Sequence, residues 1–140
     1  MKIYLINSLI IALAVGIHYE VLFQLSRRIP SLNIASRFKV IIGVFGALCA
    51  HVAEIWLFGL AYYWLSRDKS LGTLSGNYFG TLEDSVYFSF SSYTSLGIGD
   101  IEPLGDLRFL AGLESLLGLV LISWTASFLF LEMTRYWKET

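Results

Sequence analysis

Long apolar runs separated by short polar segments dominate the chain. Three runs, Ile3–Leu25, Val40–Leu65 and Leu107–Met133, contain few charged residues. Each is long enough to cross a hydrocarbon layer of about 30 Å at roughly 1.5 Å per helical residue. The pattern predicts an all-α integral membrane protein with three transmembrane helices.

A shorter apolar segment lies between the second and third runs. Thr81 precedes Glu83 and Asp84, an arrangement that favours the start of a helix because the hydroxyl and the acids satisfy the first turn. The following stretch, Leu82–Tyr93, contains neither Pro nor Gly. About twelve residues give roughly 18 Å of helix, which is half a membrane. We therefore expect a re-entrant helix.

The segment Thr94–Asp100 follows this helix and alternates glycine with larger residues. Irregular backbone at membrane depth is tolerated only where protein buries it or where it lines a water-filled cavity. Gly97 and Gly99 relieve the steric penalty on positive φ, so successive carbonyls can turn to one side of the strand. Four such strands around an axis would form rings of oxygen that replace the water shell of an ion.

Thr94–Asp100 resembles the selectivity-filter signature Thr-Val-Gly-Tyr-Gly-Asp of potassium channels. The resemblance implies a pore domain over residues 38–140. Its parts would be an outer helix at about 40–65, a pore helix at about 82–93, the filter at 94–100 and an inner helix at about 107–133. Residues 1–37 would add a transmembrane helix and a cytoplasmic loop. The implied assembly is a homotetramer with one filter strand per chain.

The resemblance also implies roles for individual residues. The carbonyls of Ser95, Leu96, Gly97 and Ile98 would bind dehydrated K⁺, with the Ser95 hydroxyl completing the innermost position. Filter support would come from Thr94, Gly99, Asp100 and Tyr87, with Tyr87 bonded to Asp100, and Gly118 would be a gating hinge or a point of close packing. Three residues depart from the family pattern. Ile98 stands where the family usually has Tyr, Ser95 stands where it has Thr, and Ser91 stands where some members carry Glu. The alternative is therefore a less selective monovalent cation channel.

Charge predicts the orientation in the membrane. The segment between the first two runs carries Arg27, Arg28, Arg37 and Lys39 and no acid, which is typical of a cytoplasmic loop. We therefore expect a multi-pass protein of the plasma membrane with an extracellular N-terminus and a cytoplasmic C-terminus. The net charge of −1 gives no basic face for nucleic acid. Tyr62 and other aromatic residues near the ends of the runs are expected to anchor at the interface.

Ionisable residues inside the second and third predicted spans are candidates for a functional role. His51 and Glu54 share a helical face in the second span, and Glu114 lies in the outer half of the third. Such residues are costly in lipid and face protein or water. They form either a hydrogen-bonded polar contact between helices or subunits, with Glu protonated, or a proton sensor that alters gating.

Two functions of other classes compete with the channel. Gly97-Ile98-Gly99-Asp100 also matches the Gly-x-Gly-Asp motif of intramembrane aspartyl proteases, but that chemistry needs a second carboxylate and no other Asp lies within a span. A non-conducting membrane scaffold or auxiliary subunit is the other. The expected partners are K⁺ with Na⁺ or Rb⁺ as alternatives, and the lipid bilayer. No catalytic residue and no cofactor besides the K⁺ ions is expected.

Overall fold

A computed structural model describes residues 2–137 of the chain. Three long helices form its frame: α1 (Lys2–Arg28), α2 (Ser36–Leu65) and α4 (Leu107–Trp137). A short 3₁₀ helix, η1 (Ile29–Ser31), follows α1 directly. The segment between α2 and α4 contains strand β1 (Gly72–Gly76), helix α3 (Leu82–Tyr93) and strand β2 (Ile101–Gly105).

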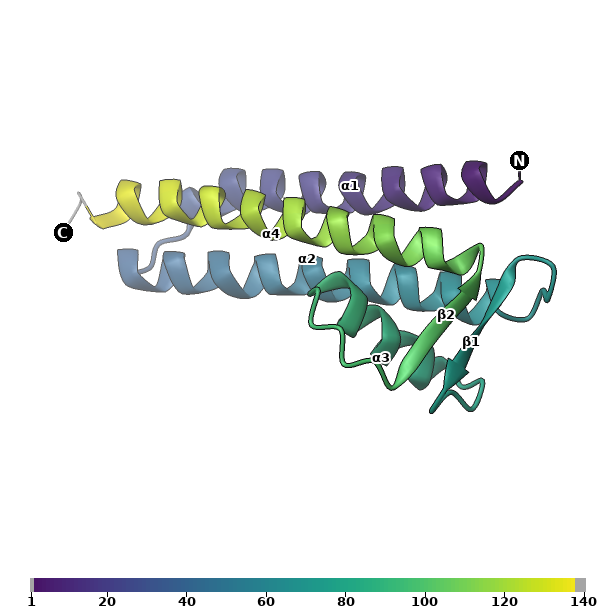
Figure 1. The fold of residues 1–140 in the computed structure, drawn as a ribbon. Coiled ribbons are helices and arrows are strands. Elements are labelled where there is room, and N and C mark those ends of the chain that lie inside the picture. Colours follow the sequence, from purple (N-terminus) through teal and green to yellow (C-terminus); the bar gives the residue numbers. More distant parts are fainter. Residues whose placement is uncertain (1, 138–140) are drawn as a thin grey trace.

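The long helices lie side by side along most of their length (Figure 1). The N-terminus is at the same end as the β-strands, and the C-terminus is at the opposite end beside the α1–α2 connection. All three helices are long and apolar enough to cross a membrane. The protein is therefore a multi-pass membrane protein built mainly from helices.

The helices extend beyond the apolar runs that predict them. α2 begins at Ser36 rather than at Val40, and α4 continues to Trp137 rather than ending at Met133. Their 30 and 31 residues correspond to roughly 45 Å, which exceeds the hydrocarbon thickness, so polar end residues can remain helical in the interface. The predicted loop between the first two helices shortens accordingly, and the Lys39 ammonium donates to the Pro30 carbonyl across it at 3.2 Å.

The predicted all-α membrane fold is confirmed, and a short antiparallel pair of strands accompanies the helices. β1 pairs with β2 in a register that places Gly72 opposite Gly105 and Gly76 opposite Ile101. The two strands are separated in the sequence by α3 and the predicted filter, so no tight-turn signal marks them. Gly72 and Gly105 approach so closely that a Cβ on Gly105 would lie 2.9 Å from the Gly72 Cα.

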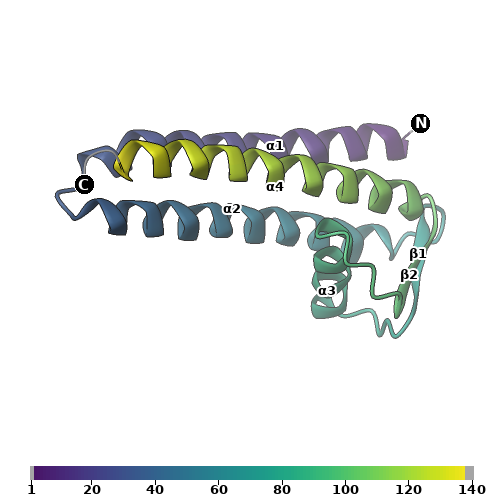
Figure 2. The same cartoon turned by 60° about the vertical axis from the view of Figure 1, so that its left-hand side comes forward.

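α3 projects from the side of the helical frame at the end that carries the strands (Figure 2). It packs on α2 at Gly59, where a Cβ would lie 2.9 Å from the Cα of Val86. The largest buried cluster joins all four α-helices and both strands at the end of the frame that carries the strands, and includes Ile10, Phe58, Leu74, Phe88, Ile101 and Leu110. This core fixes α3 and the strand that follows it against the frame.

Candidate ion-binding site

The site begins at the N-terminus of α3, which is capped as the sequence predicts. The Thr81 hydroxyl accepts from the Asp84 N–H at 3.1 Å, and Glu83 and Asp84 occupy the first turn. The helix ends at Tyr93, and Thr94 leads directly into Ser95–Asp100. This irregular segment lies outside the β-sheet, and we call it the filter strand after its expected role. The negative end of the helix dipole therefore lies next to this strand, where it favours a cation.

The backbone of the strand alternates in conformation. Ser95, Gly97 and Gly99 have φ values of 57°, 60° and 82°, whereas Leu96 and Ile98 remain at negative φ. Glycine occupies this left-handed region without penalty, but for Ser95 the same conformation costs about 1 kcal/mol. The alternation anticipated for the two glycines thus begins two residues earlier, at a serine.

Several amides of the strand are bonded back to the end of α3. The N–H groups of Ser95 and Gly97 donate to the carbonyls of Ser92 and Ser91, at 3.0 and 3.3 Å. The Ile98 N–H donates to the Ser91 hydroxyl at 3.1 Å. In a trans peptide the C=O points opposite to the N–H that follows it, so the carbonyls of Thr94, Leu96 and Gly97 point away from α3. Within residues 2–137, no hydrogen bond ends on the carbonyl oxygens of Ser95 to Ile98.

Ser91 is a functional residue that the sequence marked only as a departure from the family pattern. It is buried, and both its backbone carbonyl and its hydroxyl hold the strand. At the next residue, the Ser92 carbonyl accepts a hydrogen bond from the Ser115 hydroxyl of α4 at 2.8 Å. The end of α3 is thereby linked both to the strand and to α4.

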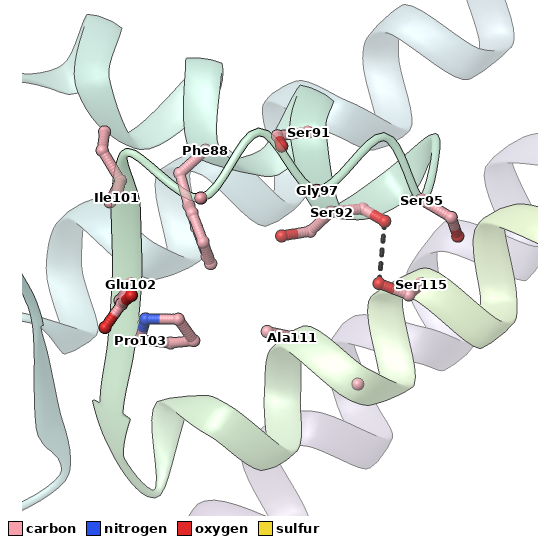
Figure 3. Close-up of a pocket in the computed structure, with 12 residues that line it drawn as sticks. Phe88, Ser91, Ser92, Ser95, Gly97, Ile101, Glu102, Pro103, Ala111 and Ser115 are labelled. Atoms are coloured by element: carbon pink, nitrogen blue, oxygen red, sulfur yellow. Dashed lines mark hydrogen bonds between the residues drawn. The ribbon is translucent and has the colours of Figure 1, made fainter.

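The strand borders a cavity of about 460 Å³ between α3, β2 and α4 (Figure 3). Ser95, Gly97 and Gly99 line it from one side, and Ala111 and Ser115 of α4 from the other. The intervening residues Leu96 and Ile98 do not line this cavity, and they are 69% and 53% exposed in the single chain. Both sides of the strand are therefore open to further contacts.

The structure brings Tyr87 and Asp100 together at the outer end of the strand. Desolvation and a side-chain hydrogen bond to the Asp100 carboxylate raise the pKa of the Tyr87 hydroxyl, which therefore stays protonated and can donate. Asp100 is also held through its backbone, because its carbonyl accepts from the Asn77 N–H at 2.8 Å. The effect of this pair on ion binding stays a prediction.

Glu114 makes its own buried contact, separate from that of His51 and Glu54. It is fully buried and accepts from the Tyr62 hydroxyl at 2.6 Å and from the Ser89 hydroxyl. Ser89 also lies 2.8 Å from the Ile55 carbonyl. Glu114 thus joins α2, α3 and α4. Tyr62, expected at the membrane interface, is instead buried in this contact.

His51 and Glu54 meet three further side chains at the C-terminal end of α3. Glu54 is fully buried and accepts from His18 Nδ1 of α1 at 2.9 Å and from the Tyr93 hydroxyl. His51 Nδ1 lies 2.8 Å from the Tyr93 hydroxyl, and its Nε2 lies 3.0 Å from Thr125 Oγ1. We call His18, His51, Glu54, Tyr93 and Thr125 the imidazole cluster. The structure supports the interpretation of a hydrogen-bonded contact between helices.

His18 was not singled out from the sequence, although an ionisable residue in the middle of an apolar run is itself a signal. Its side chain is fully buried. His18 bonds to Glu54, which bonds to Tyr93, and Tyr93 immediately precedes Thr94. These bonds connect α1 to the end of α3. The additional N-terminal helix is therefore in chemical contact with the end of α3.

Gly118 packs against the end of α3. A Cβ at this position would lie 2.0 Å from the Tyr93 carbonyl oxygen, so only glycine allows the two backbones to approach this closely. Close packing accounts for this glycine in the structure, and its role as a hinge stays a prediction.

Comparison with known proteins identifies the class. The family model described as "Ion channel" matches residues 37–135, which is more than half of the chain. The chain therefore belongs to this ion channel family, and the resemblance to the potassium channel pore domain is confirmed. Protein LctB of Geobacillus stearothermophilus is 40% identical over 52 residues, which cover 37% of this chain and only 39% of that relative. No solved structure matches the chain.

Proposed function

We propose that the chain is one subunit of a homotetrameric cation channel that selects K⁺. The observation that carries this proposal is the strand Ser95–Asp100: three of its amides are bonded to α3, while the carbonyls of Ser95 to Ile98 accept no hydrogen bond within residues 2–137. Carbonyl rings of this kind replace the hydration shell of a cation. The carbonyls of Ser95, Leu96, Gly97 and Ile98 would bind K⁺, with the Ser95 hydroxyl at the innermost position.

The tetramer follows from the number of ligands. One strand supplies one oxygen per level, so a complete ring requires several copies around a common axis. The exposed Leu96 and Ile98 side chains and the cavity on the other side of the strand supply surfaces for the neighbouring chains.

Ion selectivity is tested by flux into liposomes. Purified protein is reconstituted, and uptake of K⁺, Rb⁺, Na⁺ and Ca²⁺ is measured with and without Ba²⁺, which is close to K⁺ in size and blocks such filters. We expect K⁺ and Rb⁺ flux that Ba²⁺ inhibits, and little Na⁺ or Ca²⁺ flux. Equal K⁺ and Na⁺ flux would support the less selective channel, and no flux of any ion would support the scaffold.

Two glycines provide matched variants for this assay. Gly97 and Gly80 both have positive φ, 60° and 79°, and a Cβ would meet no atom within 4 Å at either position. Each alanine substitution therefore costs a similar backbone strain of about 1 kcal/mol. Gly97→Ala should abolish selective K⁺ flux, whereas Gly80→Ala, outside the strand, should retain it. Equal flux through both variants would contradict the assignment of the filter.

We further propose that the chain lies in the plasma membrane with its N-terminus and strands outside. The basic residues between α1 and α2 support this orientation. In a Cys49→Ser background, Lys69→Cys should react with a membrane-impermeant maleimide added to intact cells, and Asn33→Cys should react only after permeabilisation. The reverse labelling would invert the orientation.

A further inference from the structure

The imidazole cluster draws its side chains from four helices. His18 comes from α1, His51 and Glu54 from α2, Tyr93 from the end of α3 and Thr125 from α4. The chain contains two histidines, and both are in this cluster. Neither the proposed conduction of ions nor the packing of apolar surface requires two imidazoles at one carboxylate.

The ligand atoms converge on one point. His18 Nδ1 lies 2.9 Å from Glu54 Oε1, and His51 Nδ1 lies 3.4 Å from Glu54 Oε2. The potential ligand atoms of these three residues all lie within 4.8 Å of one another. Two imidazole nitrogens and one carboxylate oxygen at such separations are a donor set that suits Zn²⁺ and related divalent ions.

The opposite nitrogens of the two rings meet at a single hydroxyl. Thr125 Oγ1 lies 3.3 Å from His18 Nε2 and 3.0 Å from His51 Nε2. Histidines that bind a metal through one nitrogen donate the other N–H to an oxygen that fixes the ring. A hydroxyl oxygen has two lone pairs, so Thr125 can accept from both rings at once.

With Glu54 as a carboxylate and both rings neutral, the hydrogen bonds of the cluster need one more proton than its side chains carry. Tyr93 uses its proton on Glu54, so the Nδ1 atoms of both rings must donate, towards Glu54 and towards the Tyr93 oxygen. In neutral rings both Nε2 atoms are then acceptors, but Thr125 has one proton to give. One further proton would complete the network. A metal ion at the Nδ1 side also completes it, because both ring protons then lie on Nε2 and point at Thr125.

We propose that the imidazole cluster is a binding site for a divalent transition-metal ion of the Zn²⁺ type. His18 Nδ1, His51 Nδ1 and Glu54 are three ligands, and the Tyr93 oxygen next to them is the fourth. Tyr93 releases its proton to solvent on binding, so that a carboxylate and a phenolate neutralise the divalent charge within the membrane. His51 keeps 14% of its side-chain surface exposed, which leaves a side from which an ion can enter.

The bound ion would join α1 to the end of α3. Tyr93 immediately precedes Thr94, so the ion would hold the inner end of the filter through a single residue. This effect on conduction rests on the proposed channel function, whereas the binding of the metal does not.

Binding is measured with Co²⁺ as a spectroscopic probe on full-length protein without a histidine tag. We expect the visible absorption of four-coordinate Co²⁺, saturating at one ion per chain and displaced by Zn²⁺. His18→Gln and His51→Gln retain part of the hydrogen bonding, and Tyr93→Phe removes only the hydroxyl; each should weaken binding by at least about tenfold. Thr125→Val, which removes the shared oxygen behind the rings, should weaken it by about tenfold.

Two variants outside the cluster are the controls. Cys49→Ser removes the single thiol, which is exposed on α2, and Glu83→Gln alters an exposed acid of α3. Both should bind Co²⁺ like the original protein. Absence of a Co²⁺ spectrum, or a spectrum that survives both histidine substitutions, would overturn the proposal and leave a hydrogen-bonded polar contact only. If the protein binds no Co²⁺ but conducts K⁺ in liposomes, the metal site is overturned and the channel function stands.

Discussion

The filter strand and the imidazole cluster meet where Tyr93 precedes Thr94, but they are built in opposite ways. In the strand the side chains of Leu96 and Ile98 are 69% and 53% exposed, and backbone atoms make the contacts. In the cluster the side chains of His18 and Glu54 are fully buried and make the contacts themselves. One chain therefore completes the hydrogen bonds of the cluster alone, whereas the proposed tetramer would complete the ion site at the strand.

The contact between Gly118 and Tyr93 joins these two regions, so disrupting it should have the largest effect. Gly118→Ala places a methyl group against the Tyr93 carbonyl and should destabilise the folded protein by about 3 kcal/mol. The midpoint of thermal unfolding in detergent, followed by tryptophan fluorescence, measures the change. Gly16→Ala is the control, because a Cβ there meets no atom within 4 Å. Equal midpoints for the two variants would show that α3 shifts without cost.

Glu114 tests whether buried side-chain bonds also hold the strand in place. Glu114→Gln keeps the size of the side chain but turns an amide donor towards the Tyr62 or Ser89 hydroxyl, so we expect a loss of about 2 kcal/mol. Glu83→Gln, an exposed acid of the same kind on α3, should change the unfolding midpoint little. A Glu114→Gln midpoint that matched that of Glu83→Gln would mean that the carboxylate is already protonated and weakly bonded.

Ser91 is a side chain that acts on the strand directly. Ser91→Ala leaves the Ile98 N–H without its acceptor, a loss of about 1 kcal/mol that falls on the filter conformation. We expect the K⁺ over Na⁺ permeability ratio in liposomes to fall by about fivefold. Ser8→Ala removes a similar hydroxyl on α1, bonded to the Tyr4 carbonyl, and should leave the ratio unchanged. An unchanged ratio in Ser91→Ala would assign the strand geometry to its glycines alone.

Tyr87→Phe should have the smallest effect of this series. Tyr87 is 39% exposed, so water competes for its bond to Asp100 and the bond contributes little to stability. We expect faster loss of current during sustained activation in single-channel recordings, with K⁺ conductance retained. If conductance, selectivity and inactivation were all unchanged, Asp100 would be held through its backbone carbonyl only.

The contrast between the two regions also explains what the sequence could predict. Thr81, Glu83 and the glycines of the strand act on residues close to them in the sequence, so the start of α3 and the alternating backbone could be anticipated. The positive φ of Ser95 could not be predicted from its residue type, because it accompanies the hydrogen bond from the Ser95 N–H to the Ser92 carbonyl.

Contacts between distant helices could not be anticipated in the same way. His18 and Glu54 are 36 residues apart, and His18 and Thr125 are 107 apart. Their pairing depends on how α1, α2 and α4 rotate against one another, and three helices that are apolar on all sides give no face from which to predict that rotation. For the same reason Glu114 was grouped with His51 rather than with Tyr62.

The pairing of β1 with β2 has a consequence for how the molecule opens. The paired strands hold together the two ends of a long segment, residues 77–100, which contains α3 and the filter strand. Cooperative units of this kind exchange their amide hydrogens together when their closing contacts open. The amides of Gly76 and Asn77 at this closure should therefore exchange at the same rate as the amides of Ser95–Asp100, so the β1–β2 pair sets how often this segment opens.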